Sequence, residues 1–264
     1  MSEQAIKKIL ITGANGFIGG SLMRYYQNHG QDVVGVDLIG NDDDIVEGDI
    51  SQPDTIAQQL QECDVIIHTA ALVSNAMQDS DMWQVNVLAT RNLIQAAKEH
   101  KVRRFVQISS IVAYGNSAEG ELDETHPVHA DGGSYVLTKL ASEHVVLSEQ
   151  ANDDIEVVII RPGDAYGPGS RPWIIAPLEA IAKNQFMLPE KGEGFFRPIY
   201  IDDLVRGIAM ASKHPDAAGE IFNLSCEGYM FTKDYFTPHY QWLGKKRPLV
   251  VSTNLALKIS ALAS

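Results

Sequence analysis

The sequence predicts an α/β protein: a doubly wound parallel β-sheet with helices on both faces, and a smaller C-terminal lobe. Three observations predict this class. Apolar runs alternate with helical patterns as far as residue 160, and several runs are apolar throughout, as in strands buried on both faces. A glycine-rich turn joins the first strand to the first helix. We expect the sheet domain in 1–161 and the lobe, partly interwoven with it, in 162–264.

The predicted elements follow in chain order. A strand over 9–11 precedes the glycine turn, and an amphipathic helix follows it. Further strands are expected over 32–37, 45–49, 64–68, 104–108 and 155–160, with helices over 53–61 and 135–150. A long helix begins near Asp81, and its apolar stripe predicts the buried face: Val85, Leu88, Ala89, Leu93, Ala96 and Ala97. A polar surface loop is expected over 115–134.

Past Arg161 the alternation changes, because prolines divide the chain into short pieces. Within this part we expect helices over 173–184 and 202–212, and strands over 198–201 and 220–224. The final segment, 254–264, has the pattern of an amphipathic helix that stops abruptly, which is typical of a truncated C-terminus.

The turn after the first strand has glycines at positions 13, 16 and 19. Such a turn lets a phosphate approach the backbone and directs helix N–H groups at the anion. Asp37 ends the next strand, where a carboxylate accepts hydrogen bonds from adenosine ribose hydroxyls and repels a 2′-phosphate. No Arg or Lys stands at 38–41, so the sequence favours NAD over NADP.

A second group of polar residues follows the strand over 104–108. Ser109 and Ser110 stand at its end, and Tyr135 and Lys139 lie four apart on one helical face. A free tyrosine has a pKa near 10. A neighbouring ammonium, together with a positive nicotinamide, favours the phenolate, so we expect a pKa of Tyr135 brought toward the working range and a role in proton transfer.

These motifs together resemble the extended short-chain dehydrogenases/reductases, the NAD-dependent epimerase/dehydratase family, over residues 6 to about 245. The resemblance implies a Rossmann-type sheet, and it makes Tyr135 the general acid/base, Lys139 the ligand of the nicotinamide ribose and Ser110 a hydrogen-bond partner of the substrate oxygen. The matching segments are 12–19, Gly48-Asp49-Ile50, 68–71, Val85-Asn86-Val87, 109–115, 135–139, Arg161-Pro162-Gly163, 166–169 and 200–203.

By the same resemblance, further residues surround the cofactor. His68 has a structural hydrogen-bonding role. The expected cofactor-binding residues, with Tyr135 and Lys139, are Gly13, Asn15, Gly16, Phe17, Ile18 and Gly19 at the pyrophosphate, Asp37 at the ribose, Asp49 and Ile50 beside the adenine, Thr69, Ala70, Ala71 and Asn86 along the middle of NAD, and Gly163 near the nicotinamide.

Three departures from the epimerase pattern bear on the substrate. Asp164 replaces an asparagine and is unfavourable to a diphosphate, Val73 replaces a lysine, and Arg197 is displaced by one position. They favour the 3β-hydroxysteroid dehydrogenase-like branch, which interconverts a secondary alcohol and a ketone. A nucleotide-sugar epimerase or dehydratase is the alternative, and a non-catalytic dinucleotide-binding regulator is a third.

The second lobe is rich in aromatic and apolar side chains. We expect most of them in its core and one or two at a pocket for an alicyclic or aromatic substrate. They are Trp173, Ile174, Phe186, Phe195, Phe196, Tyr229, Phe231 and Trp242.

Composition limits the partners. A net charge of −13 argues against nucleic acid, and the absence of a signal peptide or long apolar span predicts a cytoplasmic protein without a membrane span. Cys63 and Cys226 are expected as buried thiols. His126 and His129 lie in an acidic loop without zinc spacing, so no metal is expected. The predicted partner is a small-molecule substrate, and the resemblance implies a homodimer.

Overall fold

The computed structural model describes residues 6–40, 44–61, 63–73, 78–115, 120–151 and 154–255. The chain forms two compact units. The first comprises residues 1–162 and 202–224, and the second comprises residues 163–201 and 225–264. Residues 202–224, which the sequence placed in the C-terminal lobe, thus return to the first unit. The terminal helix expected from Asn254 lies almost wholly outside the described residues.

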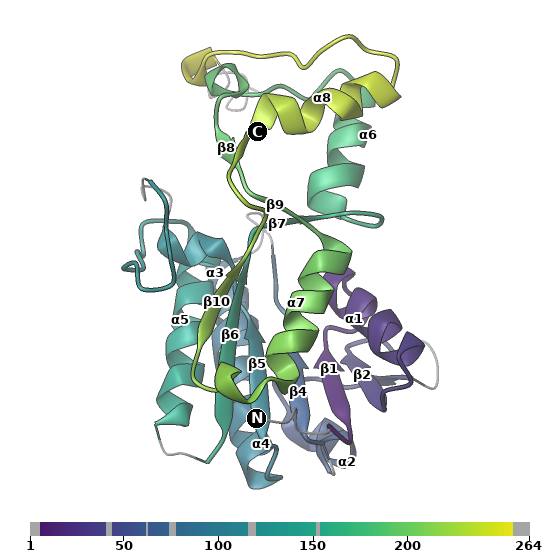
Figure 1. Ribbon diagram of the computed structural model, residues 1–264, viewed down its shortest axis with the longest axis vertical. Helices are drawn as coiled ribbons and strands as arrows, with labels where there is room; N and C mark the ends of the chain where they lie inside the picture. The colour runs from purple at the N-terminus through teal and green to yellow at the C-terminus, as the bar shows by residue number, and fades with distance from the viewer. Residues whose placement is uncertain are drawn as a thin grey trace. The chain divides into compact units, whose positions relative to one another are not determined.

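The first unit is built on a parallel sheet with the strand order β10-β6-β5-β4-β1-β2-β3, as Figure 1 shows. Buried and mainly apolar residues form its central strands, and the parallel order confirms the predicted fold class. The order reverses between β1 and β4, where sheets of this kind bind ligands. The strands are β1 (Ile9–Thr12), β2 (Val33–Asp37), β3 (Ile45–Glu47), β4 (Val65–His68), β5 (Arg104–Ile108), β6 (Glu156–Pro162) and β10 (Ile221–Leu224).

Helices cover both faces of this sheet (Figure 1). On one face α1 and α7 lie together, and the Tyr26 and Ser212 hydroxyls are hydrogen-bonded at 3.0 Å. On the other face α2, α4 and α5 enclose the main core. The helical segments of this unit are α1 (Phe17–Asn28), η1 (Pro53–Ile56), α2 (Ala57–Leu60), α3 (Asp79–Trp83), η2 (Gln84–Ala89), α4 (Thr90–Glu99), η3 (Ile111–Tyr114), α5 (Ser134–Gln150), α7 (Ile201–Lys213) and η6 (Pro215–Ala217).

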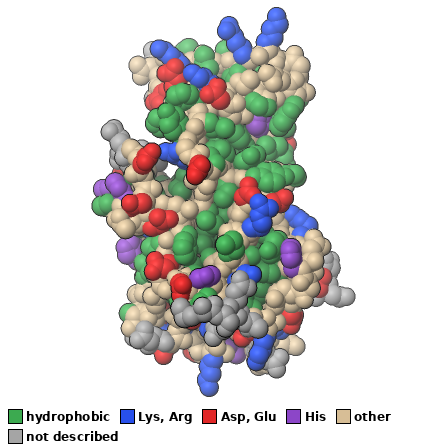
Figure 2. All heavy atoms as spheres, viewed as in Figure 1, with side chains coloured by type: hydrophobic (Ala, Val, Ile, Leu, Met, Phe, Trp, Pro, Cys, Tyr) green, Lys and Arg blue, Asp and Glu red, His purple; other side chains and the backbone are tan. Residues whose placement is uncertain are grey.

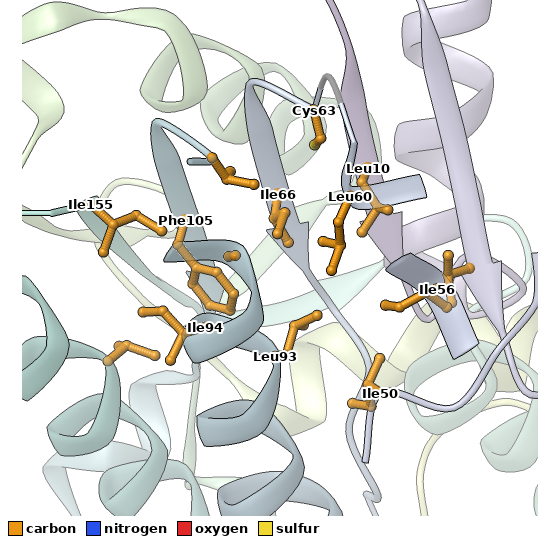
Figure 3. Close-up of a cluster of buried hydrophobic side chains, with 14 of the residues drawn as sticks. Leu10, Ile50, Ile56, Leu60, Cys63, Ile66, Leu93, Ile94, Phe105 and Ile155 are labelled. Atoms are coloured by element: carbon orange, nitrogen blue, oxygen red, sulfur yellow. The ribbon is translucent and has the colours of Figure 1, made fainter. Parts of the chain in front are cut away.

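The main core lies between the sheet and α2, α4 and α5, and Figure 3 shows part of it. Leu10 and Ile66 project from adjacent strands toward Leu60 of α2, and Phe105 of β5 packs with Ile94 of α4. Each of these five side chains is fully buried. Burying a side chain of this size contributes about 1.5–3 kcal/mol, so this cluster holds the strand ends in fixed register.

The apolar stripe predicted for the helix after Asp81 is wrong at Leu88, which is 44% exposed. The residues Gln84–Ala89 form a π-helical turn, which holds more residues per turn than an α-helix. The turn therefore shifts the helical phase, and it buries Asn86 and Val87 instead. From α4 onward the prediction is correct, because Leu93 and Ala97 are fully buried.

The second unit is held together by aromatic packing. Phe196 is 2% exposed and contacts Tyr235 and Trp173 at ring-centroid distances of 4.0 and 4.8 Å. Leu188 and Phe236 complete this core, and Tyr166 and Phe186 pack against it. Its elements are β7 (Asp164–Tyr166) paired with β9 (Pro198–Tyr200), β8 (Phe195–Phe196) paired with β11 (Met230–Phe231), η4 (Arg171–Ile175), α6 (Ala176–Ala182), η5 (Glu190–Gly192) and α8 (Thr232–Trp242).

Three of the aromatics expected in that core are exposed instead: Phe195 (66%), Tyr229 (57%) and Trp242 (64%). Phe195 alternates with the buried Phe196 along a two-residue strand, so the two side chains face opposite ways. Hydrophobic side chains accordingly reach the surface among charged ones on the face shown in Figure 2.

The two cysteines differ in their surroundings. Cys63 is buried as predicted, but Cys226 is exposed, because it follows the last strand of the sheet in a loop. None of the described helices has the length and hydrophobicity that crossing a membrane requires.

Candidate active site

The glycine turn between β1 and α1 takes a shape that other residues cannot adopt. Gly13 has a φ of +69°, and a Cβ added to it would lie 2.8 Å from the Ala70 backbone. A Cβ on Gly19 would lie 2.1 Å from the Gly13 carbonyl oxygen, to which Gly16 donates a hydrogen bond of 2.9 Å. The turn therefore passes against the segment after β4, at the point where the strand order reverses.

The turn leaves the start of α1 available to an anion. Gly16 is the N-cap of α1, and no side chain of the described residues caps the helix there. Asn15 and Gly16 are exposed, and Phe17 and Ile18 are half-buried. Helix N–H groups that lack a side-chain cap bind phosphate. This arrangement fits the pyrophosphate of a dinucleotide.

Asp37 lies at the carboxyl end of β2 and faces the same turn. Its Oδ2 accepts a 2.9 Å hydrogen bond from the backbone N–H of Asn15, and its Oδ1 accepts one of 2.8 Å from that of Leu38. The carboxylate therefore fixes the glycine turn and retains lone pairs for ribose hydroxyls. Its charge and place fit NAD, as predicted.

Asp49 and Ile50, expected beside the adenine, follow β3. The Asp49 carboxylate accepts a 2.8 Å hydrogen bond from the Ser51 N–H, which helps to lower the pKa of Asp49. The Ile50 side chain is 7% exposed and belongs to the main core. Both residues thus have structural contacts, and their role toward the adenine stays a prediction.

The segment Thr69–Ala71 runs from the end of β4 past the glycine turn. Thr69 Oγ1 donates to the Thr12 carbonyl at 2.7 Å. Asn86 is 2% exposed, and its amide holds this segment: Oδ1 accepts from the Leu72 N–H at 2.7 Å, and Nδ2 donates to the Leu72 carbonyl at 3.0 Å and to Thr138 Oγ1 at 3.1 Å. Asn86 therefore positions the segment that is predicted to line NAD.

Ser110 and Tyr135 come together at the end of β5. Burial raises the pKa of Tyr135 to about 12, and the neighbouring Ser110 side chain opposes that rise. The lowered pKa predicted for Tyr135 includes the effect of the positive nicotinamide, so it stays a prediction. Desolvation of the phenolate exceeds any stabilisation of it here. The protonated phenol is the form that can donate a proton to a ketone oxygen.

Lys139 lies one helical turn beyond Tyr135 and is 5% exposed. Its Nζ donates a 2.9 Å hydrogen bond to the Ile108 carbonyl, at the carboxyl end of β5. Burial lowers the pKa of Lys139 to about 8, and the nearby carboxylate of Glu143 opposes this. Ser110, Tyr135 and Lys139 thus meet at one strand end.

Comparison with known proteins identifies the family of this chain. The model of the NAD dependent epimerase/dehydratase family matches residues 9–225. The chain belongs to this family. Its cofactor is NAD, and the family comprises NAD-dependent dehydrogenases, epimerases and dehydratases.

Individual members of the epimerase/dehydratase family are similar over most of the chain. A UDP-glucose 4-epimerase of Vibrio cholerae is 30% identical over 83% of this chain and 70% of its own length. A 3 beta-hydroxysteroid dehydrogenase/Delta 5-->4-isomerase of Mycobacterium tuberculosis is 27% identical over 91% and 70%. The structure of MoeE5 in complex with UDP-glucose and NAD has a TM-score of 0.83, with 26% identity over 93% of this chain and 85% of that chain.

The sequence did not predict a buried ion pair next to Lys139, formed by Glu143 and Arg161. Glu143 accepts hydrogen bonds from Arg161 Nε at 3.0 Å and Nη2 at 2.7 Å, and from Ser109 Oγ at 2.5 Å. Arg161 also donates to the Tyr114 hydroxyl at 3.0 Å. The spacing of Glu143, four residues after Lys139, could have placed Glu143 on the same helical face, but it does not indicate the pairing with Arg161.

His68 is held between two threonines. Its Nδ1 is 2.7 Å from Thr12 Oγ1, and its Nε2 is 2.9 Å from Thr90 Oγ1. Burial, with a smaller effect of Lys139, lowers the pKa of His68 to about 3. The ring is therefore neutral and structural, in agreement with the prediction.

Gly163 belongs to the second unit. A Cβ there would lie 2.3 Å from the Arg197 carbonyl oxygen, so glycine is required where β7 and β9 come together. Its predicted closeness to the nicotinamide stays a prediction. The chain places the remaining predicted residues of the site in the first unit.

Proposed function

We propose that this NAD-dependent enzyme interconverts a secondary alcohol and a ketone, in the manner of hydroxysteroid dehydrogenases. The meeting of Ser110, Tyr135 and Lys139 at the end of β5 is the observation that carries the proposal. A half-buried phenol next to a hydroxyl, with an ammonium one helical turn away, is an acid/base set suited to a carbonyl oxygen.

In the oxidation, Tyr135 Oη takes the proton of the substrate hydroxyl, while Ser110 Oγ holds the substrate oxygen by a hydrogen bond. NAD supplies the hydride acceptor. Lys139 orients the nicotinamide ribose, and its positive charge stabilises the tyrosinate form. In the reduction, Tyr135 returns its proton to the carbonyl oxygen.

Asp164 supports an uncharged substrate. The Arg197 N–H donates to its Oδ2 at 3.0 Å, and no Lys or Arg of the described residues forms an ion pair with it. Burial raises the pKa of Asp164 to about 6, so at neutral pH the carboxylate is largely ionised without a counter-charge. A diphosphate group near this carboxylate would be repelled.

Exposed aromatic rings of the second unit also favour an apolar substrate. Phe195 lies 4.7 Å from the ring of Tyr229 and 5.9 Å from that of Phe231. Large exposed apolar side chains gathered in one place are typical of binding surfaces. We propose that this group contacts an alicyclic or aromatic part of the substrate.

A nucleotide-sugar epimerase or dehydratase is the second candidate, and the likeness to MoeE5 in complex with UDP-glucose and NAD favours it. Arg197 is the cation of the second unit that bears on this choice. Its guanidinium lies 5.6 Å from the ring centre of Tyr229 and donates to the Gly228 carbonyl. A nucleotide diphosphate would have to displace that bond to pair with Arg197.

Cofactor turnover distinguishes the two candidates. The purified enzyme is incubated with NAD⁺ and either secondary alcohols or nucleotide sugars, and absorbance of the reduced cofactor is followed. Net reduction with an alcohol is the expected result. Conversion of a nucleotide sugar without net reduction would overturn the proposal and establish the second candidate.

We further propose a homodimer, formed by the helices that begin near Asp79 and Ser134. Trp83 and Leu88 are exposed on the first of these segments, at 40% and 44%. Light scattering coupled to size exclusion tests the association, and a monomer at micromolar concentration would refute it.

A further inference from the structure

Helix α5 presents Tyr135, Lys139 and Glu143 at intervals of four residues, and hence on one face. Two of the three side chains are hydrogen-bonded to consecutive residues at the end of β5. Lys139 donates to the Ile108 carbonyl, and Glu143 accepts from the Ser109 hydroxyl. Tyr135 lies next to the Ser110 side chain that follows them. Tyr135, Lys139 and Glu143 thus lie at the same end of β5.

Glu143 is buried and accepts three hydrogen bonds. It is 2% exposed and Arg161 is 3% exposed, and two hydrogen bonds of 3.0 and 2.7 Å join them. Arg161 is fixed in turn by Tyr114, whose ring centre lies 4.8 Å from the guanidinium carbon. A buried ion pair this well bonded keeps the Glu143 carboxylate charged and in place.

The charged groups around Lys139 show how the Glu143 carboxylate affects its ammonium group. On α5 itself they are Tyr135 and Glu143; on β4, His68 is neutral and adds no negative charge. Arg161 on β6 is bound to Glu143. Among the described residues, Glu143 is therefore the carboxylate that stabilises the buried Lys139 ammonium against desolvation.

We propose that Glu143 is a positioning residue that keeps Lys139 charged and in place for the nicotinamide ribose, and that Arg161 fixes Glu143 for this purpose. The inference rests on the proposed function only in the role of Lys139 toward that ribose. It needs no knowledge of the substrate.

The test measures NAD⁺ binding by calorimetry between pH 6 and pH 9.5. Wild-type affinity should fall as the pH rises through about 8, where Lys139 loses its proton. In Glu143→Gln, the alkaline fall should move down by about one pH unit. The dissociation constant should then rise about fivefold near pH 8 and about tenfold above pH 9, while at pH 6 it changes little.

Two further variants separate this role from a structural one. Ser109→Ala removes a hydrogen bond to Glu143 but no charge, so it should lower the melting temperature and leave the alkaline fall in place. Glu143→Asp keeps the charge and should restore the wild-type profile. A Glu143→Gln variant that only melts earlier, with an unmoved profile, would overturn the proposal.

If Glu143→Gln does not fold, Glu143→Gln with Arg161→Met removes both charges and leaves no unpaired buried ion. A smaller downward shift is expected there, because the loss of the Arg161 cation partly offsets the loss of the Glu143 carboxylate, and the absence of any shift would also overturn the proposal. The proposed alcohol oxidation is measured separately, as turnover of NAD⁺. Failure of that activity with an intact shift in NAD⁺ binding would therefore contradict the function and not this inference.

Discussion

The two units use buried polar groups in different ways. In the first unit the buried carboxylate Glu143 is paired with Arg161 by two hydrogen bonds. In the second unit the half-buried carboxylate Asp164 accepts one backbone hydrogen bond, and the core beside it consists of aromatic rings such as Phe196 and Tyr235. Paired charges fix directions, whereas ring packing tolerates change of shape. We therefore propose that the first unit carries the chemistry and the second selects the substrate.

The largest expected effect tests the chemical role of the first unit. Tyr135→Phe removes the proton donor and should lower turnover by about 10²- to 10⁴-fold. NAD⁺ binding, measured by calorimetry, should persist because the glycine turn and Asp37 are untouched. Tyr25→Phe on α1 is the matched control and should turn over normally. Undiminished turnover of Tyr135→Phe would contradict the assignment of Tyr135 as the proton donor.

The next effect concerns the core of the second unit. Phe196→Ala leaves a cavity among aromatic rings and should lower the free energy of unfolding by about 3–5 kcal/mol, measured in urea by near-ultraviolet circular dichroism. The adjacent Phe195→Ala, at a side chain 66% exposed, should change it by only about 0.5 kcal/mol. Equal losses in the two variants would show that ring packing does not hold this unit together.

A smaller effect is expected at the adenosine end of the cofactor site. Asp37→Asn removes the charge from the hydrogen bonds to ribose, so NAD⁺ should bind about 10- to 100-fold more weakly. NADP⁺ should be discriminated against less strongly, because the repulsion of its phosphate is lost. Asp44→Asn, an exposed carboxylate near β3, is the control. Unchanged binding of both cofactors to Asp37→Asn would show that Asp37 only fixes the turn.

The smallest effect tests the lone carboxylate of the second unit. Unfolding returns Asp164 to an ordinary pKa near 3.9, whereas the folded pKa is about 6. Between these values the folded state binds more protons, so its free energy of unfolding falls as the pH rises from about 4 to about 6.

The free energy of unfolding of Asp164→Asn should therefore exceed that of the wild type by about 1–2 kcal/mol at pH 7, and this difference should disappear near pH 4. Denaturation at the two pH values measures it. Glu227→Gln, at an exposed carboxylate of the same unit, should show no such pattern. A variant less stable than the wild type at pH 7 would mean that Asp164 has a counter-charge.

The sequence by itself determined the sheet and the main parts of the cofactor site. Strands buried on both faces tend to be apolar along their length, and only glycine fits at the close contacts of the glycine turn. Both features can therefore be recognised in short stretches of the sequence. Asp37 and the pair Tyr135 and Lys139 were found for the same reason, since turn chemistry and helical spacing are short-range properties.

The tertiary structure alone decided what depends on contacts between distant segments. The pairing of Glu143 with Arg161 joins a helix to a strand, and the support of Leu72 by Asn86 joins the segment after β4 to a helical turn, so neither is visible in one local pattern. The π-helical turn that exposes Leu88 breaks the periodicity on which the prediction rested. Burial raised the pKa of Tyr135 because desolvation is a property of the whole fold.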